Sequence, residues 1–123
     1  MDNEILNCVE CISKFPSIYK SGNLSPIKIM QQCGYDKLFS LITPDLIVNY
    51  LIKNKSIIET WLLFTEDIRH SPAWGFGKTE NGKWIVVFSE KGSVKKKFLF
   101  ENEFEACAKM IIITLEEIRQ RNP

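Results

Sequence analysis

The fold of this chain is decided by residues 74–100, which read WGFGKTENGKWIVVFSEKGSVKKKFLF. Apolar and aromatic residues alternate with small or polar ones over short segments, and a period of two is typical of β-strands. Asn81-Gly82 and Lys91-Gly92 separate the segments, and Asn-Gly favours the tight turn of a hairpin. The stretch therefore predicts a three-stranded antiparallel meander, with strands over residues 73–78, 83–89 and 94–100.

The three predicted strands differ in their apolar pattern. Residues 84–88 (WIVVF) are apolar at every position, which predicts a central strand covered on both faces. Lys95–Lys97 form a basic run in the third strand. Lysine on a strand discourages pairing with another sheet, so this strand is expected at an edge.

Helices are predicted before the meander. Apolar residues recur at the helical period over residues 3–14, and Phe15-Pro16 is expected to end that helix because the residue before proline is pushed out of helical conformation. Ser25-Pro26 predicts a second helix that ends at Cys33, before Gly34.

Two more helical starts follow in the same half of the chain. Thr43-Pro44 repeats the start signal and predicts a helix to about Asn54. A further helix begins at Ser56 and carries apolar residues through Phe64.

The last predicted helix begins at Asn102, where Glu105 three positions later completes a pattern like a capping box. Met110 and Ile113 lie off its main apolar stripe, so this helix is apolar on two sides. Either it is sandwiched between the sheet and the N-terminal helices, or it presents an apolar patch to a partner such as a second copy of the chain.

These patterns predict an α+β fold in a single domain, residues 1–123. N-terminal helices and a C-terminal helix are expected to pack on a three-stranded, or slightly larger, antiparallel β-meander. Residues 1–64 form the mainly helical part, residues 65–101 the meander and residues 102–121 the C-terminal helix.

Composition bounds the function classes. The chain has 123 residues, 45% of them hydrophobic and 25% charged, which is typical of a globular domain. A net charge of +1 gives no support for a general nucleic-acid binder, whose affinity rests on concentrated Lys and Arg. The acidic start, Met1-Asp2-Asn3-Glu4, is unlike a signal peptide, and no apolar run reaches the length of a membrane span, so a soluble cytoplasmic protein is expected.

Cysteine and histidine offer little catalytic chemistry. Cys8 and Cys107 fall within apolar helical stripes and are expected to be core residues, so a zinc site with Cys11 and Cys33 is not favoured. All the cysteines are expected to be reduced, with Cys11 an exposed thiol at most. The only histidine, His70, stands beside Asp67 and Ser71 in one loop, and neighbours in a loop do not converge as a catalytic triad does.

A nucleic-acid-binding regulator is one alternative function. Lys78, Lys83 and Lys95–Lys97 would supply phosphate contacts, and Phe98 and Phe100 would stack on bases. In the competing interpretation, these phenylalanines face the core and the lysines are solvated. A small enzyme that uses Cys11 or His70 is a further alternative, for which no substrate class can be named.

Two stretches resemble a known family. Residues 61–74 (WLLFTEDIRHSPAW) and 104–112 (FEACAKMII), with Glu116-Glu117-Ile118 following, resemble segments of small bacterial immunity proteins from contact-dependent growth inhibition and related polymorphic toxin systems. With the strands between them, the resemblance covers residues 56–120. It implies a cytoplasmic, non-catalytic protein that binds and neutralises a cognate toxin domain, often a nuclease, without a metal, cofactor, membrane or small-molecule substrate.

Charged residues near the strand ends, together with one aromatic residue, are the candidate contacts for such a toxin. Loop-borne charges beside a large aromatic are common at binding surfaces. Trp74 is either an interface anchor or a core residue, and the two roles are compatible. The candidate partner-binding residues are Glu66, Asp67, Arg69, His70, Trp74, Glu80 and Glu90.

Overall fold

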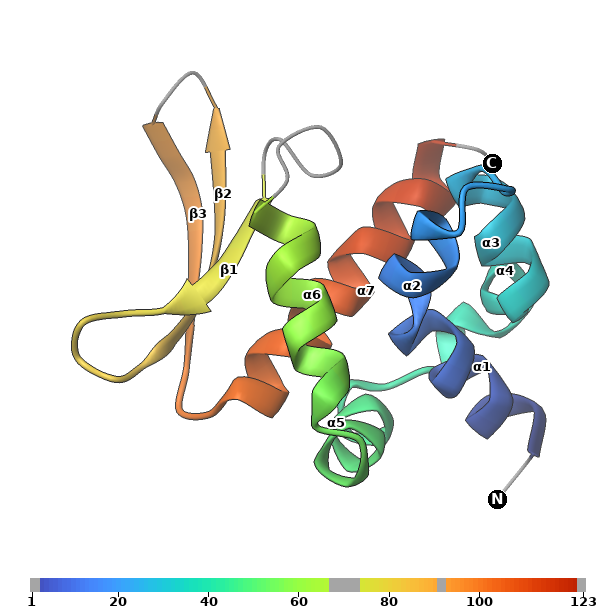
Figure 1. Ribbon diagram of the computed structural model, residues 1–123, viewed down its shortest axis with the longest axis horizontal. Helices are drawn as coiled ribbons and strands as arrows, with labels where there is room; N and C mark the ends of the chain where they lie inside the picture. The colour runs from blue at the N-terminus through green and yellow to red at the C-terminus, as the bar shows by residue number, and fades with distance from the viewer. Residues whose placement is uncertain (1–2, 67–73, 91–92, 122–123) are drawn as a thin grey trace.

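The computed structural model describes residues 3–66, 74–90 and 93–121 (Figure 1). It has an α+β fold, in which a three-stranded antiparallel sheet lies beside a larger helical body. The predicted fold class is therefore confirmed. The predicted turn at Lys91-Gly92 lies outside the described residues.

The N-terminal half is helical, as expected, but it contains more elements than the sequence patterns predict. Its helices are α1 (Asn3–Ser13), α2 (Phe15–Lys20), α3 (Pro26–Cys33), α4 (Tyr35–Leu38), the 3₁₀ helix η1 (Phe39–Leu41), α5 (Pro44–Lys53) and α6 (Ser56–Glu66). The short elements α4 and η1 are not predicted, because neither is long enough to show a helical period.

Local signals set the helix ends where they were predicted. The Ser25 hydroxyl accepts a hydrogen bond from the Lys28 backbone N–H (3.4 Å) and caps α3, while Gly34, with φ of +80°, follows its last residue. The Thr43 hydroxyl caps α5 in the same way, from the Leu46 N–H (3.3 Å). The first helix ends at Ser13, just before Phe15-Pro16, as predicted. The helix that follows it, α2, is not predicted, and Pro16 lies in its first turn, where a missing N–H costs nothing.

The sheet is a meander of β1 (Trp74–Lys78), β2 (Trp84–Glu90) and β3 (Ser93–Phe100), in that spatial order. Asn81-Gly82 forms the first turn: the Gly82 N–H donates to the Thr79 carbonyl (3.1 Å), and Gly82 has the positive φ of +82° that glycine tolerates. β2 is central and β3 is an edge strand, as predicted.

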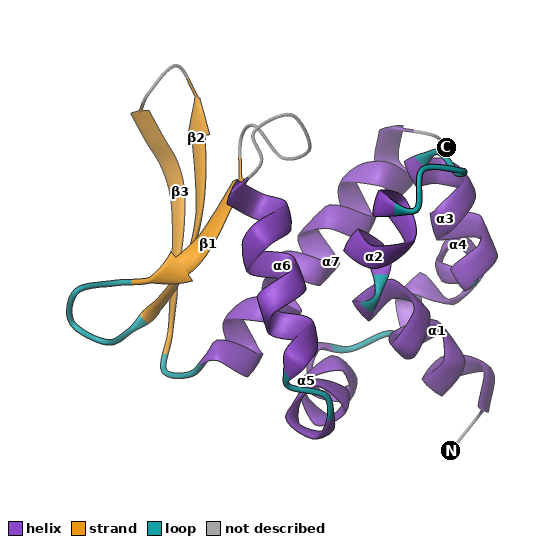
Figure 2. Ribbon diagram, viewed as in Figure 1, coloured by secondary structure: helices purple, strands orange, loops and turns teal. Residues whose placement is uncertain are grey.

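One face of the sheet, here called the inner face, packs on the helices. Phe76 and Val86 are 8% and 0% exposed, and α6 and α7 (Glu103–Arg121) are the helices that contact the strands. Figure 2 shows the helices on one side of the sheet only. The prediction that β2 is covered on both faces is therefore wrong for the part of the chain described here, since Ile85 and Val87 stay partly exposed.

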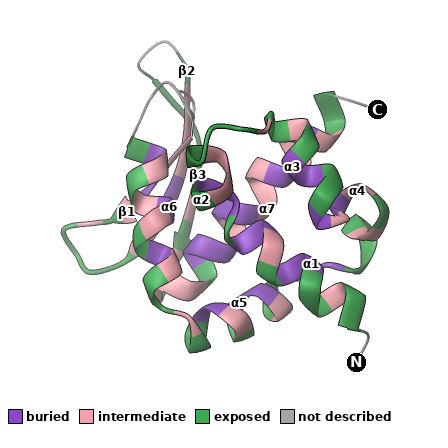
Figure 3. Cartoon of the chain, turned by 45° about the vertical axis from the view of Figure 1, so that its right-hand side comes forward, coloured by how far each residue is buried: buried purple, intermediate pink, exposed green. Residues whose placement is uncertain are grey.

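Helix α7 is sandwiched between the sheet and the N-terminal helices, one of the two arrangements expected for it. It packs against α3 and α5 on one side and against the strands on the other, and buried positions run along its length (Figure 3). Met110 is 1% exposed, so it belongs to the core and not to a surface patch, while Ile113 is half-buried. Asn102 caps α7 by accepting from the Glu105 backbone N–H (2.9 Å) and donating to the Glu105 carboxylate (2.7 Å).

The cysteines correct one expectation and confirm another. Cys11 on α1 and Cys33 at the end of α3 form a disulfide, with their Cα atoms 5.3 Å apart, so not all the cysteines are reduced. The pairing follows from the packing of α1 against α3, which no sequence spacing reveals. Cys8 and Cys107 are free thiols, 1% and 0% exposed, and occupy the core as predicted.

Among the described helices, none combines the length and the apolar character needed to cross a bilayer.

Candidate protein-binding surface

The structure divides the candidate acidic residues between the two ends of the sheet. Trp74 pairs with Phe88, so the start of β1 and the end of β2, with exposed Glu90, lie at one end. Glu66, the exposed last residue of α6, lies near the same end, where β1 begins (Figure 1). Glu80 is exposed in the hairpin loop at the opposite end. Asp67, Arg69 and His70 lie outside the described residues.

Trp74 joins the sheet to the last helix. Its indole Nε1–H donates to the Glu117 carboxylate (3.0 Å), and its ring lies 5.0 Å from the Phe88 ring and 6.4 Å from the Phe98 ring, centroid to centroid. The side chain is only partly buried. Trp74 therefore has a packing role, whatever else its exposed part contacts.

The opposite face of the sheet, here called the outer face, is not packed against any of the described helices. Side chains alternate along a strand, and the register therefore places these residues together on it: Gly75 and Gly77 of β1, Ile85 and Val87 of β2, and Lys97 and Leu99 of β3. Leu99 is 59% exposed. Within the described residues, no helix lies on this side (Figure 2).

Two glycines keep the β1 part of the outer face flat. A Cβ on Gly77 would meet no atom within 4 Å, so nothing in the described structure fills the space above it. A Cβ on Gly75 would lie 3.3 Å from the Val87 side chain, so that glycine makes room for its neighbour across the strands. A smooth surface with partly exposed Ile85 and Val87 at its centre and exposed Leu99 on the edge strand is typical of a protein-binding site.

Charged groups flank this apolar centre. At the hairpin end, the Lys83 ammonium contacts both carboxylate oxygens of Glu101 at 2.6 Å. At the other end, Lys97 lies beside Val87, and a register shift leaves Lys95 without a partner on β2. The outer face thus has a polar rim at both ends, with excess positive charge on β3.

The arrangement of the sheet gives less support to nucleic-acid binding. Phe98 and Phe100 face inwards, and the Phe98 ring lies 4.4 Å from the Lys109 ammonium on α7. They therefore form no stacking platform on the outer face beside Lys97. The candidate lysines are also separated, because Lys78 and Lys83 lie at the hairpin end and Lys95–Lys97 towards the other.

A cluster that sequence reasoning missed joins α4, η1 and α7. The Tyr35 hydroxyl donates to Glu116 (2.8 Å), and Arg119 donates to the same carboxylate through Nε (2.7 Å) and a terminal nitrogen (2.9 Å). The Arg119 guanidinium also lies 3.8 Å from the centroid of the Phe39 ring. No local pattern reveals this cluster, because Tyr35 and Glu116 are 81 positions apart.

The electrostatics of that cluster indicate a structural role. Hydrogen bonds from Arg119 and Tyr35 lower the pKa of Glu116, and burial, together with the bond to Glu116, raises the pKa of Tyr35. Perturbed groups are frequent at active sites. Here, however, Tyr35 is 2% exposed and its hydroxyl is held protonated, so it is poorly placed to attack a substrate.

The described cysteines and acidic residues likewise form no catalytic or metal-binding group. Burial raises the pKa of the Cys8 thiol to about 11, and burial likewise raises the pKa of Cys107. A thiol of this kind is largely protonated at neutral pH and is a weak nucleophile. Across residues 3–66, 74–90 and 93–121, no group of three or more His, Cys, Asp or Glu side chains is arranged to hold a metal ion.

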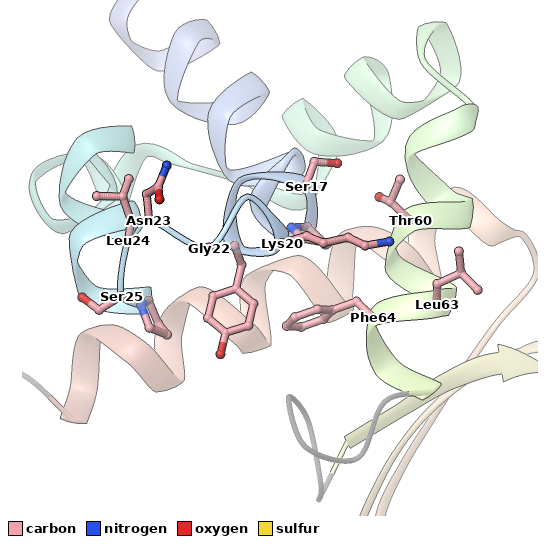
Figure 4. Close-up of a pocket in the computed structure, with 12 residues that line it drawn as sticks. Ser17, Lys20, Gly22, Asn23, Leu24, Ser25, Thr60, Leu63 and Phe64 are labelled. Atoms are coloured by element: carbon pink, nitrogen blue, oxygen red, sulfur yellow. The ribbon is translucent and has the colours of Figure 1, made fainter.

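A cleft lies apart from the sheet surface, between α2, residues 21–25 and α6 (Figure 4). Its volume is about 830 Å³, and its lining mixes aromatic, aliphatic and hydroxyl side chains with one lysine. The cleft has no sequence signal, because its two walls come from segments far apart in the chain.

Comparisons of the chain with family models, with curated proteins and with solved structures give no match.

Proposed function

We propose that this protein is an immunity protein, which binds a cognate toxin domain, such as a nuclease, and neutralises it by covering the active site or the substrate-binding surface. The observation that carries the proposal is the outer face of the sheet, an uncovered apolar surface with polar ends. The resemblance of residues 56–120 to immunity proteins supports the same function.

The architecture suits an inhibitor that works by binding alone. The outer face belongs to a sheet fixed to α6 and α7 by Phe76, Val86 and the Trp74–Glu117 hydrogen bond. A surface that is already rigid loses little conformational entropy on binding. Such an inhibitor needs no cofactor, and it would act in the cytoplasm of the cell that makes the toxin.

In this proposal, the candidate charged residues form the rim of the toxin-binding interface. Glu66 and Glu90, near the start of β1, and Glu80, in the hairpin loop, lie at the two ends of the sheet and not on its outer face. Charges at a rim chiefly affect the association rate and the choice of partner, whereas the buried apolar centre supplies most of the affinity. We therefore place the main contacts at Ile85, Val87 and Leu99.

The proposal is tested first by affinity capture of the partner and then by rescue of cells from the captured toxin. The tagged protein is used to isolate bound proteins from its native cells, and a stoichiometric partner that is the C-terminal part of a large exported protein supplies the toxin. Co-expression with this chain should then restore the growth that the toxin alone prevents. A stable complex with a non-toxic partner, or growth inhibition that persists despite co-expression, would contradict the proposal.

A matched pair of variants locates the surface. Leu99→Arg introduces a charge at a 59% exposed position on the outer face, and Ile52→Arg introduces the same charge at a 47% exposed position on α5. Leu99→Arg should weaken toxin binding by at least tenfold, because it places a charge in the apolar centre. Ile52→Arg should leave binding and rescue unchanged.

The exposed lysines of β3 are the observation that favours the alternative function, nucleic-acid binding, and this alternative has its own test. If the chain is a nucleic-acid-binding regulator, it should shift RNA or DNA in a gel, and the affinity should fall steeply with salt because phosphate contacts release counterions. Lys96 and Lys97 replaced together by glutamine would then abolish the shift. Absence of any shift at low salt excludes this alternative.

A further inference from the structure

The cleft between α2, residues 21–25 and α6 has an aromatic floor. The rings of Tyr19 and Phe64 meet edge to face, with centroids 6.2 Å apart. Both rings rest on Phe15, which is 2% exposed and stacks against the fully buried Trp61. This part of the cleft is therefore backed by the core and offers a firm apolar surface.

The rim of the cleft carries apolar groups that face solvent. Leu63 is 57% exposed and projects from α6, and Leu24 lies on the opposite wall (Figure 4). A volume of about 830 Å³ is within the range of sites that take small organic molecules. The exposed Leu63 and the partly buried Leu24, which flank an aromatic floor, favour a ligand with an apolar body.

The charge of the lining has one sign. Among the described residues that line the cleft, Lys20 is the only cation and none carries a carboxylate. Its side chain extends across the cleft towards α6 (Figure 4). The remaining polar lining is neutral and comes from side chains such as Ser17, Asn23 and Thr60.

The Cys11–Cys33 disulfide restrains one wall of the cleft. Of the 12 lining residues, all but Thr60, Leu63 and Phe64 lie in the segment that the disulfide closes. In the oxidised protein, closing that segment limits the conformations open to α2 and residues 21–25, which reduces the entropy cost of ordering this wall around a ligand.

We infer that this cleft binds a small amphipathic anion, whose apolar body packs on Tyr19 and Phe64 and whose acidic head pairs with Lys20. The inference is independent of the proposed toxin-binding function, because the cleft and the outer face of the sheet share no residue. A carboxylate and a phosphate would satisfy Lys20 equally, so the shared chemistry is an anionic head on an apolar body.

The test is a titration of the ¹⁵N-labelled full chain, followed by backbone amide shifts. The probes share one octyl body and differ in the head group: octanoate, octyl phosphate, octanol and octylammonium. Octanoate, octyl phosphate or both should shift the amides of residues 17–25 and 60–64 in a saturable way. Octanol should bind about threefold to fivefold more weakly, as expected for loss of one solvent-exposed ion pair, and octylammonium more weakly still.

Variants assign the head-group and body contacts. Lys20→Gln should reduce the affinity for the anions to that for octanol, whereas Lys28→Gln, an exposed lysine of α3 outside the lining, should change nothing. Leu63→Asp should abolish anion binding. The matched control is Ile52→Asp on α5, where the side chain is of similar size and similarly exposed, and this change should leave binding intact. The unperturbed remainder of each spectrum shows that the variant is folded.

The titrations distinguish a carboxylate ligand from a phosphate ligand, and both from the absence of an anion site. Preference for octanoate alone indicates a carboxylate ligand, and preference for octyl phosphate alone a phosphate ligand. Equal binding of octylammonium and octanoate, shifts confined to other parts of the chain, or no saturable shift with either anion would overturn the inference. None of these outcomes bears on toxin rescue, which is measured with Leu99→Arg.

Discussion

The indole of Trp74 donates a hydrogen bond to the Glu117 carboxylate across 3.0 Å, and this bond ties the first strand to the last helix. The two residues are 43 positions apart. Because Phe88 and Phe98 flank the same ring, Trp74 helps to hold the sheet on α7, together with the buried Phe76 and Val86. If the outer face binds a toxin as proposed, this attachment helps to keep that face rigid.

Trp74→Phe should destabilise the fold by about 1–3 kcal/mol, because it removes a hydrogen bond to a charged group and leaves the ring contacts largely in place. Urea unfolding measures the change. A double-mutant cycle with Glu117→Gln should show coupling between the two sites, and additive effects would mean that the hydrogen bond contributes little.

Removal of the disulfide by Cys11→Ser with Cys33→Ser should lower the free energy of unfolding by about 3 kcal/mol, as expected for a closed segment of this length. The bridged residues are 22 positions apart. Unfolding of oxidised and reduced wild-type protein, compared with the double variant, measures the effect. Equal stability of all three forms would contradict it.

The state of that disulfide in cells also reports on the compartment. A reducing cytoplasm is expected to keep Cys11 and Cys33 as thiols, whereas an oxidising compartment preserves the bridge. Rapid acid quenching followed by alkylation and mass spectrometry counts the free thiols. Two alkylated cysteines indicate an oxidised protein, and four indicate a reduced one.

The Cys8 thiol should react slowly with iodoacetamide in the native, oxidised protein. Its pKa is raised to about 11, mainly by burial, so only about one thiol in a thousand is ionised at pH 8. Its 1% exposure limits access further. Modification should accelerate with pH up to about 11 and become fast on unfolding in urea. Rapid labelling of Cys8 in the native protein at pH 8 would show that this thiol is neither buried nor raised in pKa.

Tyr35→Phe should cost about 1–2 kcal/mol of stability, because Glu116 loses one of its hydrogen-bond donors and keeps Arg119. The pKa of Glu116 is lower in the folded chain, so its contribution is present above the ordinary glutamate pKa of about 4.3 and is lost as the pH falls through the lower folded value. The difference between wild type and variant should therefore shrink in acid. A constant difference from pH 7 to pH 2 would contradict this.

Gly77→Thr should raise the stability of the isolated chain by about 0.4–1 kcal/mol, because a Cβ there meets no described atom and a β-branched residue suits a strand. Gly75→Thr is the matched control: its Cβ would press on Val87 at 3.3 Å, so the gain should be smaller or reversed. If the outer face binds the toxin, Gly77→Thr should also weaken the complex while stabilising the free protein.

Much of the local structure could be predicted because its causes lie within a few residues. Gly82 permits the hairpin turn, Ser25 and Thr43 cap the helices that follow them, and Asn102 caps α7 through Glu105. Pro16 marks the end of α1 as predicted, but α2 was missed, because a proline that follows one helix is equally suited to the first turn of the next.

The longer helices, the three strands, the α+β class and the two-sided apolar character of the last helix could therefore be predicted from the sequence, whereas the short elements α2, α4 and η1 could not. Which faces are covered depends on tertiary packing. An apolar strand such as residues 84–88 does not reveal that its second face is left open, because that depends on where distant helices pack. The same holds for the Cys11–Cys33 disulfide, the Tyr35–Glu116 bond and the cleft at Lys20, each of which joins side chains that come together only when separate helices pack against one another.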